Sequence, residues 1–205
     1  MKLLAYEVDK RPFLGVFNED ETWVYPISAA GMEYRSMKDL IREAGPSEME
    51  MLDYISKKAP GDVTGAAPVE EIRIVSPIPE PDQDIICLGI NYMDHAAESA
   101  RFQKEEFARP EKAIYFSKRV NRTNDPDGII PAHKNLTNQL DYEAELAVII
   151  KKDAKDVKPE EVKDYIFGYT IMNDVSAREV QTEHKQWYFG KSLDGFTPLG
   201  PCIMT

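Results

Sequence analysis

Short runs of apolar residues, each about as long as a β-strand, recur along this chain and predict a protein built mainly of strands. They occur at residues 3–8, 12–17, 22–27, 85–89, 113–118, 140–150 and 165–174. Helical spacing of apolar residues is found at fewer places, namely 37–44, 47–58, 94–108 and the residues after 174. We therefore expect an α+β fold, in which a β-rich region is accompanied by peripheral helices.

The chain changes character near its middle. Residues 76–83 include three prolines, and this composition predicts an extended linker. The linker would separate a small N-terminal α+β domain at residues 1–75 from a second domain at residues 84–205. The run at 85–89 in the second domain is entirely apolar apart from Cys87 and Gly89, so we expect a buried strand there.

Two carboxylates stand close together in the strand at 140–150. Side chains alternate along a strand, so Glu143 and Glu145 share one face. The opposite face is apolar from Tyr142 to Ile150 and is expected to be buried. Neighbouring carboxylates repel each other and lose hydration, so a divalent metal ion would be a favourable partner. The alternative is that both glutamates line the solvated face of an edge strand.

A third carboxylate favours the metal interpretation. Asp174 stands at the C-terminal end of the strand at 165–174, before a helix that Ser176 could cap. Three carboxylates form an all-oxygen ligand set, which suits Mg²⁺ or Mn²⁺ better than zinc. Glu143, Glu145 and Asp174 are therefore the predicted metal ligands.

Five further residues could take part in chemistry. His95 and Glu98 have the i,i+3 spacing of a helix, and a carboxylate that orients an imidazole makes a general base for activating water. Arg178 and Gln181 would share a helix face beside Asp174, where they could bind a substrate carboxylate. Lys191 could stabilise developing negative charge. Each of these could instead be an ordinary surface residue.

Composition narrows the classes of function. The net charge of −11 argues against nucleic acid or an anionic membrane as a partner, since both require a basic surface. No apolar run is long enough for a membrane span, and charges interrupt the N-terminus too early for a signal peptide. Cys87 and Cys202 lie in apolar contexts typical of core thiols. We expect a cytoplasmic protein.

Four ordered motifs resemble the fumarylacetoacetate hydrolase family. They are Gly89-Ile-Asn-Tyr-Met-Asp-His-Ala-Ala-Glu98, Leu140-Asp-Tyr-Glu-Ala-Glu-Leu-Ala-Val148, Phe167-Gly-Tyr-Thr-Ile-Met-Asn-Asp-Val-Ser-Ala-Arg178 and Gly190-Lys-Ser192. The resemblance extends from Asp84 to Thr205. It implies a mixed β-roll or barrel for this domain and a homodimer.

The resemblance also implies roles for the candidate residues. Mg²⁺ or Mn²⁺ would be held by Glu143, Glu145 and Asp174. The pair His95 and Glu98 would activate water from a lid segment, and Arg178, Gln181 and Lys191 would line the substrate pocket. The implied substrates are small 2-oxo and 2,4-dioxo acids.

The resemblance leaves the reaction open. We expect hydrolysis of a C–C bond through a metal-stabilised enolate, as in an acylpyruvate hydrolase. The alternatives are an oxaloacetate decarboxylase, an isomerase or lyase of catabolic enol acids, or a catalytically silent protein that binds metal or ligand. Members of this family continue beyond the position of Thr205, so the chain is expected to be a fragment of a longer protein.

Overall fold

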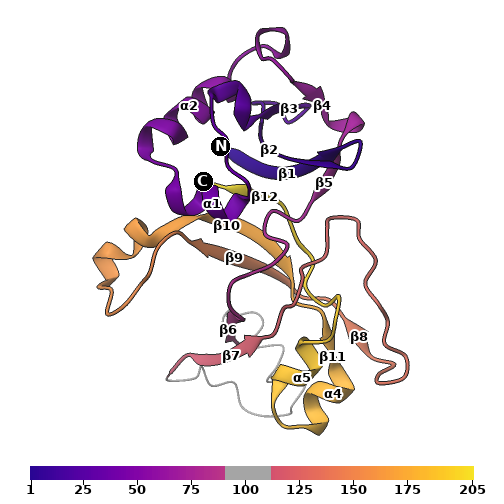
Figure 1. The fold of residues 1–205 in the computed structure, drawn as a ribbon. Coiled ribbons are helices and arrows are strands. Elements are labelled where there is room, and N and C mark those ends of the chain that lie inside the picture. The colour runs from indigo at the N-terminus through magenta and orange to yellow at the C-terminus, as the bar shows by residue number, and fades with distance from the viewer. Residues whose placement is uncertain (91–111) are drawn as a thin grey trace.

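The computed structural model describes residues 1–90 and 112–205 (Figure 1). Its strands form one large antiparallel sheet, in the order β4-β3-β2-β1-β12-β10-β9 with β5 added to β1, and two small pairs, β8–β11 and β6–β7. The strands are β1 (Lys2–Val8), β2 (Arg11–Phe17), β3 (Trp23–Pro26), β4 (Ala67–Pro68), β5 (Arg73–Val75), β6 (Ile85–Gly89), β7 (Ile114–Lys118), β8 (Leu140–Asp141), β9 (Ala144–Ile150), β10 (Ile166–Asn173), β11 (Ser176–Ala177) and β12 (Leu199–Met204).

The helices in the described part of the chain are short. The α-helices are α1 (Met37–Glu43), α2 (Pro46–Ser56), α4 (Arg178–Glu183) and α5 (Trp187–Lys191). The 3₁₀ helices are η1 (Ile27–Ala30), η2 (Pro60–Asp62), η3 (Val69–Glu71) and η4 (Pro159–Tyr165). The prediction of a sheet-dominated α+β fold is confirmed. None of the helices in the described ranges is long and apolar enough to cross a membrane.

Local sequence signals explain the N-terminal elements. Asp9 and Lys10, which join β1 to β2, both have positive φ angles, as a two-residue turn of the kind that matches strand twist requires. The side chain of Ser36 accepts a hydrogen bond from the backbone N–H of Asp39 and so caps α1. Pro46 begins α2, where its missing N–H costs nothing.

The main hydrophobic core lies between these helices and the sheet. Leu40 of α1 and Leu52 of α2 are fully buried against Leu3 and Val16 of β1 and β2. Ile203 of β12 belongs to the same core, so both halves of the chain contribute to it. Burial of apolar surface at this junction holds the N-terminal strands on the rest of the sheet.

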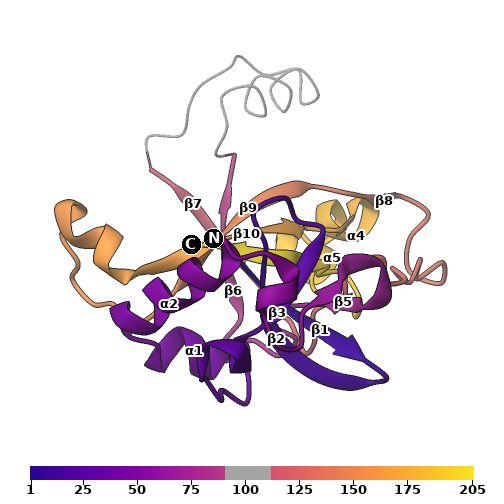
Figure 2. The same ribbon diagram turned by 90° about the horizontal axis from the view of Figure 1, so that it is seen from above.

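One continuous sheet joins the two halves of the chain. Lys2 and Leu3 of β1 pair with Met204 and Ile203 of β12. Strand β12 also pairs with β10, which pairs with β9. Figure 2 shows β9 and β10 beside the N-terminal strands, while β6 and β7 extend away from the body of the molecule. The division into domains at residues 75 and 84 stays a prediction.

The structure contradicts the expectation that the apolar face of residues 140–150 is buried. Leu146 is 60% exposed and Ile150 is 52% exposed, and the neighbouring Ile171 of β10 is 60% exposed on the same face. Strand β9 is the last strand of the sheet, and only its other face, through Ile149, packs on the main core. Periodicity identified two faces but assigned the wrong one to the interior.

Two smaller expectations are also wrong. Strand β6 is not buried throughout, because Ile86 is 74% exposed and pairs only with β7 in a two-stranded sheet. Ser176 does not cap a helix, because it belongs to β11, and α4 begins at Arg178. The predicted helix at 94–108 lies outside the described residues.

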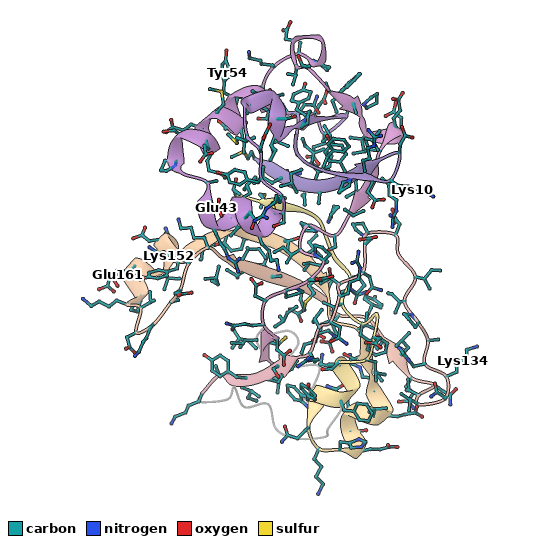
Figure 3. The ribbon with its side chains drawn as sticks, in the orientation of Figure 1. Lys10, Glu43, Tyr54, Lys134, Lys152 and Glu161 are labelled. Carbon is teal, nitrogen blue, oxygen red and sulfur yellow. The ribbon has the colours of Figure 1, made fainter. Side chains whose placement is uncertain are left out.

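The connection between β9 and β10 extends away from the rest of the structure. It contains η4, and Figure 3 shows Lys152 and Glu161 on this extension, at the left of the view. The ammonium of Lys152 lies 4.2 Å from the centre of the Tyr165 ring, which closes the base of the extension. These residues lie apart from the candidate site described below.

Because Tyr6 is buried, we expect the folded protein to lose stability at alkaline pH. Burial raises the pKa of its phenol to about 12, against about 10 for an unfolded tyrosine. The unfolded chain therefore loses this proton first, so the stability that depends on Tyr6 is present below pH 10 and is lost between pH 10 and 12. At pH 11, midway between these two pKa values, we expect Tyr6→Phe to reduce this loss by roughly 1 kcal/mol. Urea midpoints at pH 8 and pH 11 test this, and equal losses in both proteins would contradict it.

Candidate active site

Two backbone interactions bring Glu143 beside Asp174. The N–H of Asp174 donates to the carbonyl of Glu143 at 2.8 Å, and the N–H of Glu143 donates to the side chain of Asn173 at 3.1 Å. These contacts continue the β9–β10 pairing past the ends of both strands. The two carboxylates therefore meet where β10 ends, although 31 positions separate them along the chain.

One ammonium lies between these two carboxylates. Nζ of Lys191 donates to Oε2 of Glu143 at 2.7 Å and to Oδ2 of Asp174 at 2.6 Å. The side chains of Lys191 and Asp174 are each 3% exposed. Both carboxylates thus converge on a single cation in a largely buried space, where charge interactions are stronger than in water.

Helix packing places Lys191 at this point. Lys191 is the last residue of α5, and its ammonium lies 5.2 Å from the centre of the Phe116 ring on β7. Trp187, at the start of α5, packs edge-on against the same ring. At Gly190 a Cβ atom would come within 2.7 Å of the backbone N of Gln181, so only glycine allows α5 to pack this closely on α4.

Arg178 forms the outer side of the site. Its guanidinium donates to Asp141 through Nε and Nη2, at 3.0 and 2.8 Å, and to Oε1 of Glu143 through Nη1 at 2.7 Å. Gln181 accepts a further hydrogen bond from Arg178 at 3.1 Å, as their spacing on α4 allows. The β8–β11 pair sets Asp141 opposite Ser176, next to the start of α4.

Sequence reasoning missed Lys118 at the end of β7. Its side chain is completely buried, and its ammonium donates to Oδ1 of Asp174 at 2.6 Å and to the carbonyl of Val175 at 3.2 Å. It also missed Asp141 and Cys87. Of these three residues, only Lys118 could have been noticed in the sequence, because it is the single charge that follows the uncharged run Ile114-Tyr-Phe-Ser117.

The charges change the pKa values of these groups. Burial would raise the pKa of Glu143, but the hydrogen bond and charge of Lys191, together with Arg178, hold it below its usual value. Burial lowers the pKa of Lys118, and Asp174 opposes that change. Burial and the charge of Asp174 raise the pKa of the Cys87 thiol to about 12, with a smaller contribution from Glu145. Cys87 is therefore a protonated thiol at neutral pH.

Some of the predicted site residues contact one another in the structure, and others do not. Glu143, Asp174, Arg178, Gln181 and Lys191 form one connected cluster. Glu145 is half-buried two residues beyond Glu143, and its charge acts on Cys87 together with that of Asp174. His95 and Glu98 lie outside the described residues.

The side chains that could act as metal ligands agree in part with the predicted metal ion. Among residues 1–90 and 112–205, no three His, Cys, Asp or Glu side chains gather closely enough to hold an ion. Glu143 and Asp174 nevertheless direct oxygens at one cation, and Mg²⁺ is often held by only one or two protein carboxylates, with water and substrate as its other ligands. The residues therefore fit a hard divalent cation held by two carboxylates.

Comparison with known proteins gave consistent matches. A family model described as the fumarylacetoacetate (FAA) hydrolase C-terminal domain matches residues 84–205. Oxaloacetate tautomerase YisK of Bacillus subtilis is 41% identical over 149 residues, which cover 72% of this chain and 48% of that protein.

Solved structures agree with the sequence matches. A fumarylacetoacetate hydrolase from Exiguobacterium antarcticum superposes with a TM-score of 0.77 at 34% identity, covering 100% of this chain and 66% of that one. A maleylpyruvate hydrolase from Sphingobium has a TM-score of 0.67 at 27% identity, covering 100% and 68%. The chain thus spans about half to two thirds of the length of these relatives.

Proposed function

We propose, since this chain belongs to the fumarylacetoacetate hydrolase family, that its site at the end of β10 binds a small 2-oxo or 2,4-dioxo acid and stabilises the enolate that forms from it. The observation that supports this most directly is the convergence of Glu143 and Asp174 on the ammonium of Lys191. A buried group of carboxylates and cations suits a reaction in which negative charge develops on a substrate oxygen.

Glu143 and Asp174, with Glu145 beside them, would hold Mg²⁺ or Mn²⁺. A bound divalent cation would supply Lewis-acid polarisation of the 2-oxo group. The ammonium of Lys191 lies where it could donate a hydrogen bond to the developing oxyanion. Arg178 could turn from Asp141 to bind a substrate carboxylate, because a guanidinium binds carboxylates through two parallel hydrogen bonds. Gln181 would orient Arg178.

For the reaction, we propose hydrolysis of a C–C bond in an acylpyruvate. His95 and Glu98 would remove a proton from water, and the resulting hydroxide would add to the distal carbonyl. The C–C bond then breaks, and its electron pair leaves on pyruvate as the enolate. A proton returns to C3 of that enolate, so that the products are pyruvate and a carboxylic acid. Lys191 would stabilise the enolate oxygen during the cleavage.

The similarity to an oxaloacetate tautomerase supports a second candidate. Keto–enol isomerisation of oxaloacetate moves one proton between C3 and the 2-oxo oxygen and breaks no C–C bond. The same groups would stabilise the enolate of oxaloacetate, and no water is consumed. Decarboxylation of oxaloacetate differs only in that CO₂, rather than a proton, leaves C3.

Three assays with Mg²⁺ separate these reactions. Acetylpyruvate is supplied and pyruvate and acetate are measured. Oxaloacetate is supplied and pyruvate and CO₂ are measured. Enol-oxaloacetate is supplied and the loss of its ultraviolet absorbance is followed. Formation of pyruvate and acetate supports the hydrolase, whereas faster loss of the enol without CO₂ supports the tautomerase. Turnover of none of these substrates while the metal ion is bound would contradict the proposal and favour a silent binding protein.

A further inference from the structure

Lys118 joins two segments that belong to different sheets. It ends β7, which pairs only with β6, and its ammonium reaches Asp174 and Val175 just beyond the end of β10. A fully buried ammonium is costly unless charged and polar acceptors compensate for lost hydration. The carboxylate of Asp174 and the carbonyl of the next residue provide two acceptors, and together they fix the position of the ammonium.

This arrangement also fixes the orientation of the Asp174 carboxylate. Oδ1 is held by Lys118 at 2.6 Å, so Oδ2 faces the space that Asp174 shares with Glu143 and Lys191. The second bond of Lys118, to the main chain at Val175, prevents the ammonium from following a rotation of the carboxylate. Rotation of Asp174 would therefore break the shorter of the two bonds.

We propose that Lys118 is a positioning residue, which holds Oδ1 of Asp174 so that only Oδ2 is presented to a divalent cation. This inference rests on the proposed function, because it assigns Lys118 a role in the metal site proposed there. When a residue that hydrogen-bonds to a metal ligand is removed, metal affinity or activity typically falls by about 10–100-fold.

Replacing Lys118 with methionine should change Mn²⁺ affinity in opposite directions, depending on whether Lys118 acts as a counter-charge or positions Asp174. Met keeps much of the length and volume of the lysine stem but removes the charge. If Lys118 were only a counter-charge, its loss would favour a cation, and Mn²⁺ would bind more tightly. If Lys118 positions Asp174, Lys118→Met should weaken Mn²⁺ binding by about 10–100-fold. The dissociation constant of Mn²⁺ is measured by titration calorimetry and by the electron paramagnetic resonance signal of the free ion.

Two further variants complete the experiment. Lys118→Gln provides an uncharged amide donor for Asp174, and we expect it to bind Mn²⁺ within about tenfold of the wild type and more tightly than Lys118→Met. Leu52→Ala, in the core under α2, should lower the thermal midpoint without changing the Mn²⁺ affinity, and it controls for a general loss of stability.

The outcomes distinguish this inference from the proposed function. If the wild type binds Mn²⁺ and Lys118→Met binds it equally or more tightly, the positioning role is overturned and the proposed function stands. If the wild type itself binds no Mn²⁺, the proposed metal site is overturned and this role falls with it. If Lys118→Met does not fold, Lys118→Gln decides, and an affinity tighter than that of the wild type overturns the inference.

Discussion

Replacing Asp174 with asparagine is expected to cost the metal-free chain about 3–5 kcal/mol of unfolding free energy. Asp174 is the shared partner of two buried ammoniums, Lys118 at 2.6 Å on Oδ1 and Lys191 at 2.6 Å on Oδ2. An amide has the shape of the carboxylate but no charge, so Asp174→Asn leaves both cations in a space of low polarity. Removal of one partner of a buried ion pair is costly for this reason, and here two pairs are lost.

Urea unfolding of the wild type and of Asp174→Asn in the presence of a chelator measures this effect. Asp141→Asn is a suitable control, because Asp141 belongs to the same cluster through Arg178 but its side chain is 47% exposed. An exposed ion pair contributes about 1 kcal/mol or less, so the control should lose no more than that. Equal losses in the two variants would show that burial of the lysines adds nothing to the stability of this site.

Local signals in the sequence predicted most individual elements. The limits of α1 and α2 differ by no more than two residues from the ranges that apolar periodicity predicted, and in the structure Ser36 and Pro46 stand at their starts. The long-range pairings were not predicted. The pairing of Lys2 with Met204 joins the two ends of the chain, and no periodicity within a short window contains information about such a partner.

The site was predicted in a similarly uneven way. Glu143, Glu145 and Asp174 were proposed as site residues because carboxylates in an apolar strand or at its end are unusual enough to require an explanation. Lys118 was missed because a lysine at the end of a strand is usually a surface residue. In the structure it is fully buried and contacts Asp174 just beyond β10, and that contact joins residues far apart in the chain.

The paired charges also explain why a three-ligand metal cluster was expected but is not formed among the described residues. The prediction treated the carboxylates as lacking cations. In the structure, Asp141, Glu143 and Asp174 are bonded to Arg178, Lys118 and Lys191, which balance their charge. A divalent cation that takes both Glu143 and Asp174 must therefore compete with Lys191, whose ammonium already lies between them.

This competition leads to a second large effect, in which metal affinity and turnover change in opposite directions. Replacing Lys191 with methionine removes the positive charge between Glu143 and Asp174, and the freed carboxylates should bind Mn²⁺ about tenfold more tightly or better. The same change removes the hydrogen-bond donor proposed to stabilise the enolate, and kcat should fall by about 10²–10³. General damage to the site would instead weaken both properties together.

The conservative variant Lys191→Arg separates charge from geometry. It keeps the positive charge between the carboxylates, so Mn²⁺ affinity should stay close to that of the wild type. A guanidinium is larger than an ammonium, and the site beside Phe116 is closely packed, so kcat should still fall. Mn²⁺ titrations and steady-state kinetics on the substrate that the assays identify measure both quantities. Weaker Mn²⁺ binding by Lys191→Met would show that Lys191 supports the metal site rather than competing for it, and unchanged kcat would remove Lys191 from the proposed chemistry.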